Sequence, residues 1–196
     1  MNTRGWFLLL LMSITAQAVD KDRYKVEDAS SYPSKQTNSG LTIAVVPFQT
    51  AEQMKSAFGK VDLGEFGVLP VLLVMKNESG KTLNLNAMEV SYVTPTRREV
   101  AATPSDEVRF LDAPQRPNLG PGRIPNPLPK RKKKSKLAID EIDGYAFHAK
   151  MIPAGESAHG FFYFQIAHRP GSQIYVRGIV EAASGKELLF FEVPMN

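Results

Sequence analysis

The stretch Val68–Lys76, which reads V-L-P-V-L-L-V-M-K, decides the fold of this chain. Its run 71–75 is apolar without a break, too short for a membrane helix and closed by the turn signal N-E-S-G at 77–80. A short apolar run of this kind predicts a strand that is covered on both faces. Pro70 cannot donate a hydrogen bond to a ladder. We therefore expect regular pairing to begin at the next residue, with 67–70 as an extended approach or edge segment.

Six other segments combine alternating or aromatic apolar residues with turns of Gly, Pro, Asn and Asp at their ends, which is typical of strands. They cover residues 41–48, 83–92, 145–152, 158–166, 173–182 and 187–193. A change of parity between Leu85 and Met88 predicts a bulge near Asn86-Ala87. With the central strand, these segments predict a mainly β fold: a two-sheet antiparallel sandwich, immunoglobulin-like in outline, with about seven strands.

One or two short helices are expected beside the strands. Thr50 is a helix cap with Gln53 in the capping-box position, Met54 and Phe58 turned inward, and Gly59 as the stop. A second start reads T-P-S-D-E at 103–107, with Thr as the cap, Pro at the first position and acids in the first turn. The segment L-A-I-D-E-I-D at 137–143 predicts one further helical turn.

Residues 1–18 are typical of a secretory signal peptide. Arg4 gives the positive start, residues 6–12 give a short apolar region, and A-Q-A at 16–18 gives the small-x-small cleavage pattern. An uncleaved anchor is the alternative, but the apolar region falls short of the roughly 20 residues that a spanning helix needs. Residues 19–40 lack periodicity and predict a flexible leader. Residues 41–194 are then expected to form a single domain, interrupted by a loop at 112–136.

Cysteine is absent from the chain. This excludes disulfides, thiolate metal sites, cysteine catalysis and the lipidated cysteine of a bacterial lipoprotein. An exported chain without disulfides depends on its apolar core, and its composition favours a bacterial source and a periplasmic or secreted location. Asn77-Glu78-Ser79 matches a glycosylation sequon, but a tight turn is the expected meaning in a bacterial protein.

Positive charge is concentrated in one short segment. The full chain carries a net charge of +4, yet the basic run K-R-K-K-K-S-K at 130–136 contributes six positive charges on its own. The preceding residues 112–129 hold six prolines and two glycines and predict an exposed, partly polyproline-like loop. The candidate polyanion-binding residues are therefore Lys130, Arg131, Lys132, Lys133, Lys134 and Lys136.

Several short motifs together resemble an uncharacterised group of exported bacterial proteins with an immunoglobulin-like β-sandwich domain. The motifs are F-G at 58–59, G-V-L-P-V at 67–71, N-E-S at 77–79, P-A-G-E-S at 153–157, G-F-F-Y-F at 160–164 and V-P at 193–194. The resemblance covers roughly residues 47–194 and implies no activity and no site residues. Members of the group often carry a lipidated cysteine after the signal, and this chain departs from that pattern.

The sequence shows few signs of a catalytic or metal-binding site. The three histidines, His148, His159 and His168, match no ligand spacing on one helix. The first two would share a surface if segments 145–152 and 158–166 paired, and ordinary strand histidines are the alternative. No G-x-S-x-G elbow or phosphate loop is present. We therefore expect no metal and no cofactor.

Two further groups have a functional and a structural interpretation. Asp140, Glu141 and Asp143 either bind calcium weakly or pair with the adjacent lysines, and we favour the pairing. The aromatic run 161–164 forms either an exposed platform, as in sugar binders, or part of the core, which we favour.

The sequence predicts an exported, non-catalytic module that binds or scaffolds at the bacterial cell envelope. Its basic run would attract an anionic envelope component or an acidic protein; a solvated insertion without a partner is the alternative. Nucleic-acid recognition is not expected, because no aromatic residues interleave the lysines. An envelope hydrolase or a carbohydrate-binding protein, with a site assembled from distant residues, is the other function considered.

Overall fold

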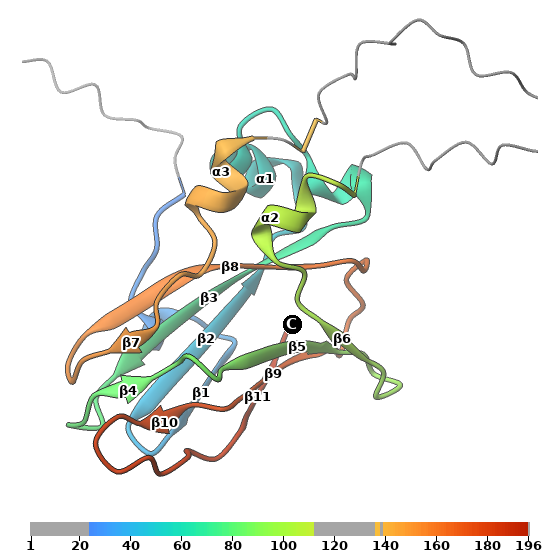
Figure 1. Ribbon diagram of the computed structural model, residues 1–196. Coiled ribbons are helices and arrows are strands. Elements are labelled where there is room, and N and C mark those ends of the chain that lie inside the picture. Colours follow the sequence, from blue (N-terminus) through green and yellow to red (C-terminus); the bar gives the residue numbers. More distant parts are fainter. Residues whose placement is uncertain (1–23, 112–135, 138, 196) are drawn as a thin grey trace, which may run out of the picture.

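The computed structural model describes residues 24–111, 136–137 and 139–195 (Figure 1). This part of the chain is mainly β, with eleven strands in three antiparallel sheets and a few short helices. Sheet I has the strand order β1-β2-β3-β8, sheet II the order β10-β4-β7, and sheet III the order β11-β9-β5-β6.

The strands are β1 Lys35–Asn38, β2 Leu41–Pro47, β3 Leu69–Asn77, β4 Leu83–Asn84, β5 Glu89–Val93, β6 Glu99–Ala101, β7 Met151–Ile152, β8 Ser157–Phe164, β9 Gln173–Arg177, β10 Val180–Glu181 and β11 Phe191–Pro194. The helices are α1 Ala51–Phe58, α2 Ser105–Val108 and α3 Asp140–Gly144, with 3-10 turns η1 Ala29–Ser31 and η2 Leu63–Phe66.

Sheet I is the middle layer of the molecule and is covered on both faces. Along β3, Leu69, Val71 and Leu73 face an inter-sheet core that is completed by side chains of β5, β9 and β11. The alternate residues Leu72 and Val74 face a helix-side core, which contains side chains of α1, α2 and α3. Figure 1 shows these helices gathered over one end of sheet I. The arrangement is sandwich-like, with a helical layer added and with more strands than the expected seven.

The central-strand prediction is confirmed, because every residue of β3 except Lys76 is buried. Pairing with β2 begins at Val71 as expected, but pairing with β8 already includes Leu69 and Pro70. The Pro70 carbonyl accepts a hydrogen bond from the Phe48 N–H at 2.9 Å. A strand residue directs its nitrogen and its carbonyl toward the same neighbour. The missing N–H of Pro70 therefore faces a position just past the end of β2 and leaves the ladder with β8 intact.

Residues 24–40 differ from the expected flexible leader. Lys35–Asn38 pair with β2 as strand β1, and Ala29 is 1% exposed. The Tyr24 ring lies 5.3 Å from that of Phe161 and 5.9 Å from that of Phe48, in edge contacts with the helix-side core. The segment lacks an apolar period because β1 is an edge strand whose side chains are exposed or only half-buried. Residues 19–23, like the signal segment, lie outside the described residues.

The first helix matches its prediction in detail. Gln53 N–H donates to the Thr50 hydroxyl, and the Gln53 side chain accepts from the Thr50 N–H, so the capping box is complete. Met54 and Phe58 are buried, and Gly59 ends the helix at a φ of 64°. At α2 the expected cap is wrong: the Thr103 N–H donates to the Tyr163 carbonyl at 2.7 Å, and Pro104 takes the cap position without a side-chain bond.

Four expected strands are shorter or interrupted. Of segment 145–152 only β7 is a strand, and it pairs with β4 instead of β8. Segment 187–193 becomes a strand only at Phe191, as β11. Segment 83–92 is divided between β4 in sheet II and β5 in sheet III, so a change of sheet replaces the predicted bulge. Segment 173–182 is divided in the same way between β9 and β10. These divisions account for two of the additional strands, and β1 and β6 are the other two.

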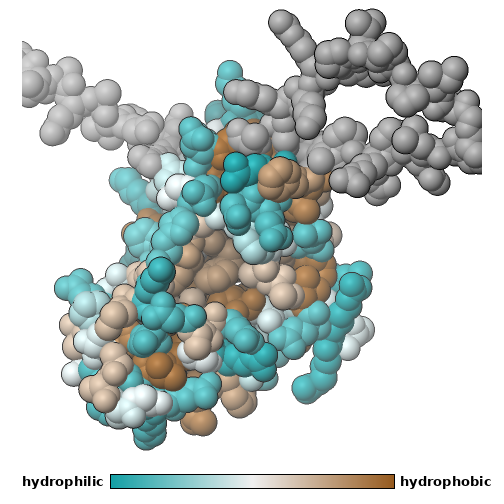
Figure 2. Space-filling view, viewed as in Figure 1, coloured by the Kyte–Doolittle hydropathy of each residue, from teal (hydrophilic) through white to brown (hydrophobic). Residues whose placement is uncertain are grey.

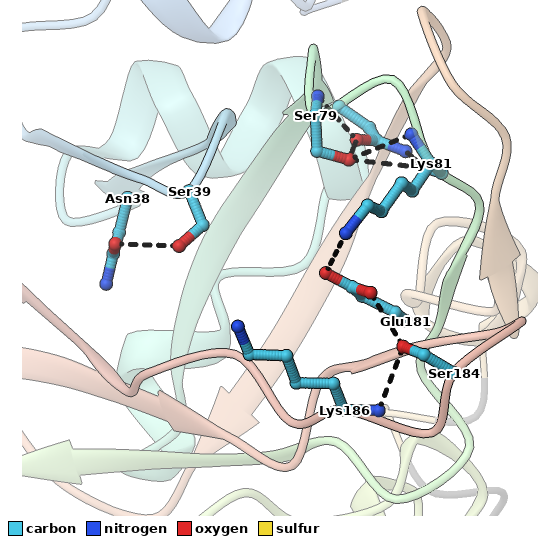
Figure 3. A network of polar contacts seen from close by, with 8 residues as sticks. Asn38, Ser39, Ser79, Lys81, Glu181, Ser184 and Lys186 are labelled. Atoms are coloured by element: carbon cyan, nitrogen blue, oxygen red, sulfur yellow. Dashed lines mark hydrogen bonds and ion pairs between the residues drawn. The ribbon is translucent and has the colours of Figure 1, made fainter.

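Asn77 joins the turns at one end of the sandwich and is completely buried. Its side-chain amide donates to the carbonyls of Lys81, Ile152 and Pro153 at 2.7–3.0 Å, and its oxygen accepts from Ser79 N–H and Oγ. Figure 3 shows how the same turn reaches β10, through an ion pair between Lys81 and Glu181 at 2.6 Å. Asn77 therefore serves the expected turn, and its side chain is fully occupied by protein partners.

The described helices include none that is long and apolar enough to cross a bilayer.

Candidate functional site

The basic run lies almost entirely outside the described residues. Only Lys136 is described, and its Nζ lies 6.0 Å from the centre of the Phe66 ring. The next residue, Leu137, is 1% exposed, and Leu111, which precedes residues 112–135, is half-buried against the helix-side core. The chain on both sides of the basic run is therefore packed against the helical layer.

The carboxylates that follow the basic run belong to α3. Asp143 accepts a hydrogen bond from the Ser105 hydroxyl at 2.7 Å, which links α3 to α2. No group of three or more His, Asp or Glu side chains in the described part of the chain is arranged to hold a metal ion. Apart from Lys136, the lysines that were expected to pair with Asp140, Glu141 and Asp143 lie outside the described residues, so that pairing stays a prediction.

The surface with two paired histidines, which was the less favoured interpretation of the sequence, does not form. It required segments 145–152 and 158–166 to form an antiparallel pair, whereas the contact between Ala146 and Phe161 is an isolated parallel bridge. His148 and His159 are both exposed. The ring Nε2 of His148 lies 2.7 Å from the Asp143 carbonyl, so this nitrogen carries the hydrogen and donates it.

The aromatic run of β8 belongs to the core, as favoured from the sequence. Phe161 and Tyr163 are buried on the helix side, and Phe164 is buried between the sheets. Phe162 is only half-buried, and its ring stacks on Phe147 with centroids 5.4 Å apart and an interplanar angle of 27°. Phe161, Phe162 and Tyr163 of this run also line a surface cavity, together with Phe147.

A cavity of about 330 Å³, here called the edge pocket, opens beside β8. Apolar walls come from Ala102, Pro104, Phe147 and Phe162, and the polar lining residues are Thr103, Ser105, Asp106 and His148. Figure 2 shows a hollow lined mainly by hydrophobic side chains below the helical end of the molecule. Its volume lies at the lower limit for small-molecule sites.

The outer edge of β8 forms the floor of the edge pocket because two distant segments cover it only in part. Thr103 bonds the backbone of Tyr163, while Phe161 donates to the Tyr145 carbonyl and accepts from the Phe147 N–H at 2.8 and 3.1 Å. Gly160 permits the second contact, since a Cβ there would lie 2.5 Å from the Phe147 Cα. The pocket lies between these two coverings.

Replacing Gly160 with alanine is expected to push residues 145–147 away from β8. The free energy of unfolding should fall by about 1–3 kcal/mol, the range for overpacking a tight contact. Hydrogen exchange at the Phe147 amide, which now donates to Phe161, should accelerate more than exchange at the amides of β2. An unchanged Phe147 exchange rate would show that the segment is not held by this contact.

Two polar groups of the edge pocket are hydrogen-bonded to α3. The Ser105 hydroxyl donates to the Asp143 carboxylate at 2.7 Å. The His148 Nε2 donates to the Asp143 carbonyl at 2.7 Å. Both side chains therefore hold α2, α3 and the 146–148 segment together.

A second polar cluster, around Tyr92, includes residues that follow the C-terminal end of β8. The Tyr92 hydroxyl is buried, donates to Ser172 Oγ at 2.8 Å and accepts from the Arg169 N–H at 2.9 Å. His168 Nδ1 lies 3.5 Å from the same oxygen, and its ring lines a cavity of about 220 Å³ with Met54 and Leu69. Burial lowers the pKa of His168 below its ordinary value of 6.5.

This burial predicts a stability that falls in weak acid. Since the folded state lowers the pKa of His168, the unfolded chain binds the proton more readily, and protonation below pH 6.5 favours unfolding. Above that pH the imidazole is neutral in both the folded and the unfolded state, so it does not make the free energy of unfolding depend on pH. Urea unfolding between neutral pH and about pH 5 should show a steeper loss for the natural chain than for His168→Gln. Parallel curves for the two proteins would contradict the prediction.

Sequence reasoning missed the edge pocket and the Tyr92 cluster. The pocket combines residues from 102–106, 146–148 and 161–163, which no local spacing connects. A weak signal existed in G-F-F-Y-F at 160–164, where a glycine inside a strand indicates the close approach of another backbone. From the sequence, Tyr92 was only the last residue of the expected strand 83–92.

Comparisons with known proteins are sparse. No protein-family model and no curated protein matches this chain. A solved structure of a "putative lipoprotein", ycdA of Bacillus subtilis subsp. subtilis str. 168, is 12% identical with a TM-score of 0.37; the match covers 82% of this chain and only 38% of ycdA. The yjhA protein of Bacillus subtilis is 8% identical with a TM-score of 0.42, over 84% of this chain and 98% of yjhA.

A functionally unknown protein from Listeria monocytogenes EGD-e is 14% identical with a TM-score of 0.36, over 83% of this chain and 81% of that protein. No activity, ligand or partner comes to this chain from these similarities.

Proposed function

We propose that this chain is an exported, non-catalytic β-sandwich module, immunoglobulin-like in outline, that binds an anionic component of the bacterial cell envelope through the basic run. It belongs with the exported bacterial group that its motifs resemble, and it acts in the periplasm or outside the cell after loss of residues 1–18. The six basic residues Lys130, Arg131, Lys132, Lys133, Lys134 and Lys136 are its binding residues.

The observation that carries this proposal is the attachment of the chain on either side of the run. Leu137 is buried in the helix-side core and Leu111 packs against it, so both attachment points belong to one layer of the folded body. Between these two attachment points the sequence carries six positive charges within the seven residues 130–136. Basic residues near an anionic surface contribute about 1 kcal/mol each, so such a segment suits a phosphate-rich surface.

The non-catalytic part of the proposal is supported by the edge pocket. Its hydroxyl and imidazole groups are used in bonds that connect α2, α3 and the 146–148 segment. Its remaining walls are largely apolar. A binding function requires no more than this.

The test compares binding to phosphatidylglycerol vesicles and to inorganic polyphosphate at low and high salt. Residues 19–196 serve as the natural form, and one variant changes all six basic residues of the run to serine. The affinity of this variant should fall at least about a hundredfold at low salt, and added salt should weaken the natural protein strongly.

The chain offers a control with the same change of charge. Six exposed basic residues lie away from the run: Lys25, Lys55, Lys60, Arg98, Lys150 and Lys186. Their replacement by serine should weaken binding only modestly, because scattered charges do not meet one surface together. Equal losses in the two variants would reduce the effect to net charge, and unchanged binding in the first would remove the basic run from the function.

A further inference from the structure

We propose that the edge pocket binds an organic ammonium group carried on an apolar or aromatic body. This inference does not depend on the basic run, and it concerns a ligand of the opposite charge. It rests on three features of the pocket: an aromatic wall, an acidic residue at its lining, and the absence of lysine and arginine among the described residues that line it.

The aromatic wall is formed by Phe147 and Phe162. Their rings stack with centroids 5.4 Å apart, and both are half-buried, so part of this surface is open to the cavity. An aromatic face attracts a cation through its quadrupole while its apolar area packs against a hydrocarbon body. Ala102 and Pro104 extend the apolar surface on the opposite side.

The charge of the lining is negative. Asp106 lines the pocket, is exposed, and forms no ion pair with another described residue. The Arg109 side chain lies close by, but it is directed to the Asp106 carbonyl and to the Phe110 ring and lines a neighbouring cavity. The carboxylate is therefore available to a cation in the edge pocket.

The other polar groups fit the same ligand class. The Ser105 hydroxyl and the His148 Nε2–H both donate to Asp143, so neither group is ready to donate to an anionic ligand. An anion would thus meet a carboxylate and aromatic faces without a positive partner. A volume of about 330 Å³ accommodates a single ring with an aminomethyl group rather than a polymer.

Three probes of nearly equal shape separate these contributions: benzylamine, benzyl alcohol and benzoate. Their binding to residues 19–196 is followed by chemical-shift changes in ¹⁵N-labelled protein at neutral pH. Benzylamine should bind about fivefold more tightly than benzyl alcohol and benzoate more weakly than both, with the largest shifts at Ala102, Phe147 and Phe162. Equal affinities for the three probes, or shifts centred elsewhere, would overturn the proposal.

Two variants at neighbouring positions complete the test. Asp106→Asn should remove the fivefold preference for the amine while leaving benzyl alcohol binding unchanged. Glu107→Gln, which removes the same charge from α2 at a residue that does not line the pocket, should preserve the preference. Phe162→Leu should weaken the binding of both benzylamine and benzyl alcohol. If Glu107→Gln abolishes the preference as fully as Asp106→Asn does, the general field of the surface is responsible and the pocket assignment fails.

Discussion

Replacing Asn77 with alanine is expected to lower the free energy of unfolding by about 3–5 kcal/mol. The side chain is completely buried and makes five hydrogen bonds, three of them to carbonyls of the 81 and 152–153 segments. Removing it takes a donor from all three carbonyls, of which those of Lys81 and Pro153 keep a second donor. Each buried polar group that loses its partner costs about 1–3 kcal/mol. Urea unfolding of residues 19–196 at neutral pH measures the loss.

Two variants locate the cause of this loss. Asn77→Asp keeps the shape but turns an oxygen toward the three carbonyls, so it should destabilise at least as much as alanine at neutral pH. Ser79→Ala removes only the hydroxyl that donates to Asn77, and should cost about 1 kcal/mol. A loss below about 1 kcal/mol for Asn77→Ala would mean that water replaces the side chain at these carbonyls.

Replacing Gly178 with alanine should destabilise the fold by about 3–5 kcal/mol, the second large effect. Gly178 lies between β9 and β10 with a φ of 77°, where a side chain is strained. In addition, a Cβ would lie 2.0 Å from the Ala87 carbonyl oxygen, on the segment that connects β4 to β5. The β4–β5 connection and the β9–β10 connection each pass between sheets II and III, and they are in contact at this point. The backbone therefore cannot move here without disturbing both sheets. Thermal unfolding by circular dichroism provides the measurement.

Gly185 is the matched control for this substitution. It has a similar φ of 68°, but a Cβ there meets nothing within 4 Å. Gly185→Ala should therefore cost only the backbone term of about 1–2 kcal/mol. If the two variants lose equal stability, the contact with Ala87 has no energetic importance.

The parts of the fold that could be predicted are those whose signals are local. The apolar run of β3 and the alternation of β2 each require burial whatever lies opposite, and the Thr50 capping box is complete within four residues. Pairing partners are not local. Segment 145–149 is predicted to be a strand from its sequence, yet hydrogen bonds to Phe161 and to α3 hold it without a strand ladder. β1 was missed because an edge strand needs no apolar period.

The same distinction separates the two candidate sites. The basic run is visible in the sequence because its charges are consecutive, although residues 130–135 lie outside the described part of the chain. The edge pocket was not foreseen, because Asp106, Phe147 and Phe162 meet only after β8 is placed at the side of sheet I. Asp106 was noted only as an acid in a helical first turn.

The seam between the first and last strands has a practical consequence. β1 covers the edge of β2, and Gln36 Oε1 accepts a hydrogen bond from the Glu192 N–H of β11 at 2.7 Å. A chain shortened to begin at Leu41, the domain boundary expected from composition, would leave one edge of β2 without a neighbouring strand. Such an unpaired edge recruits strands from other molecules, so the shortened protein is expected to aggregate where the longer one stays monodisperse.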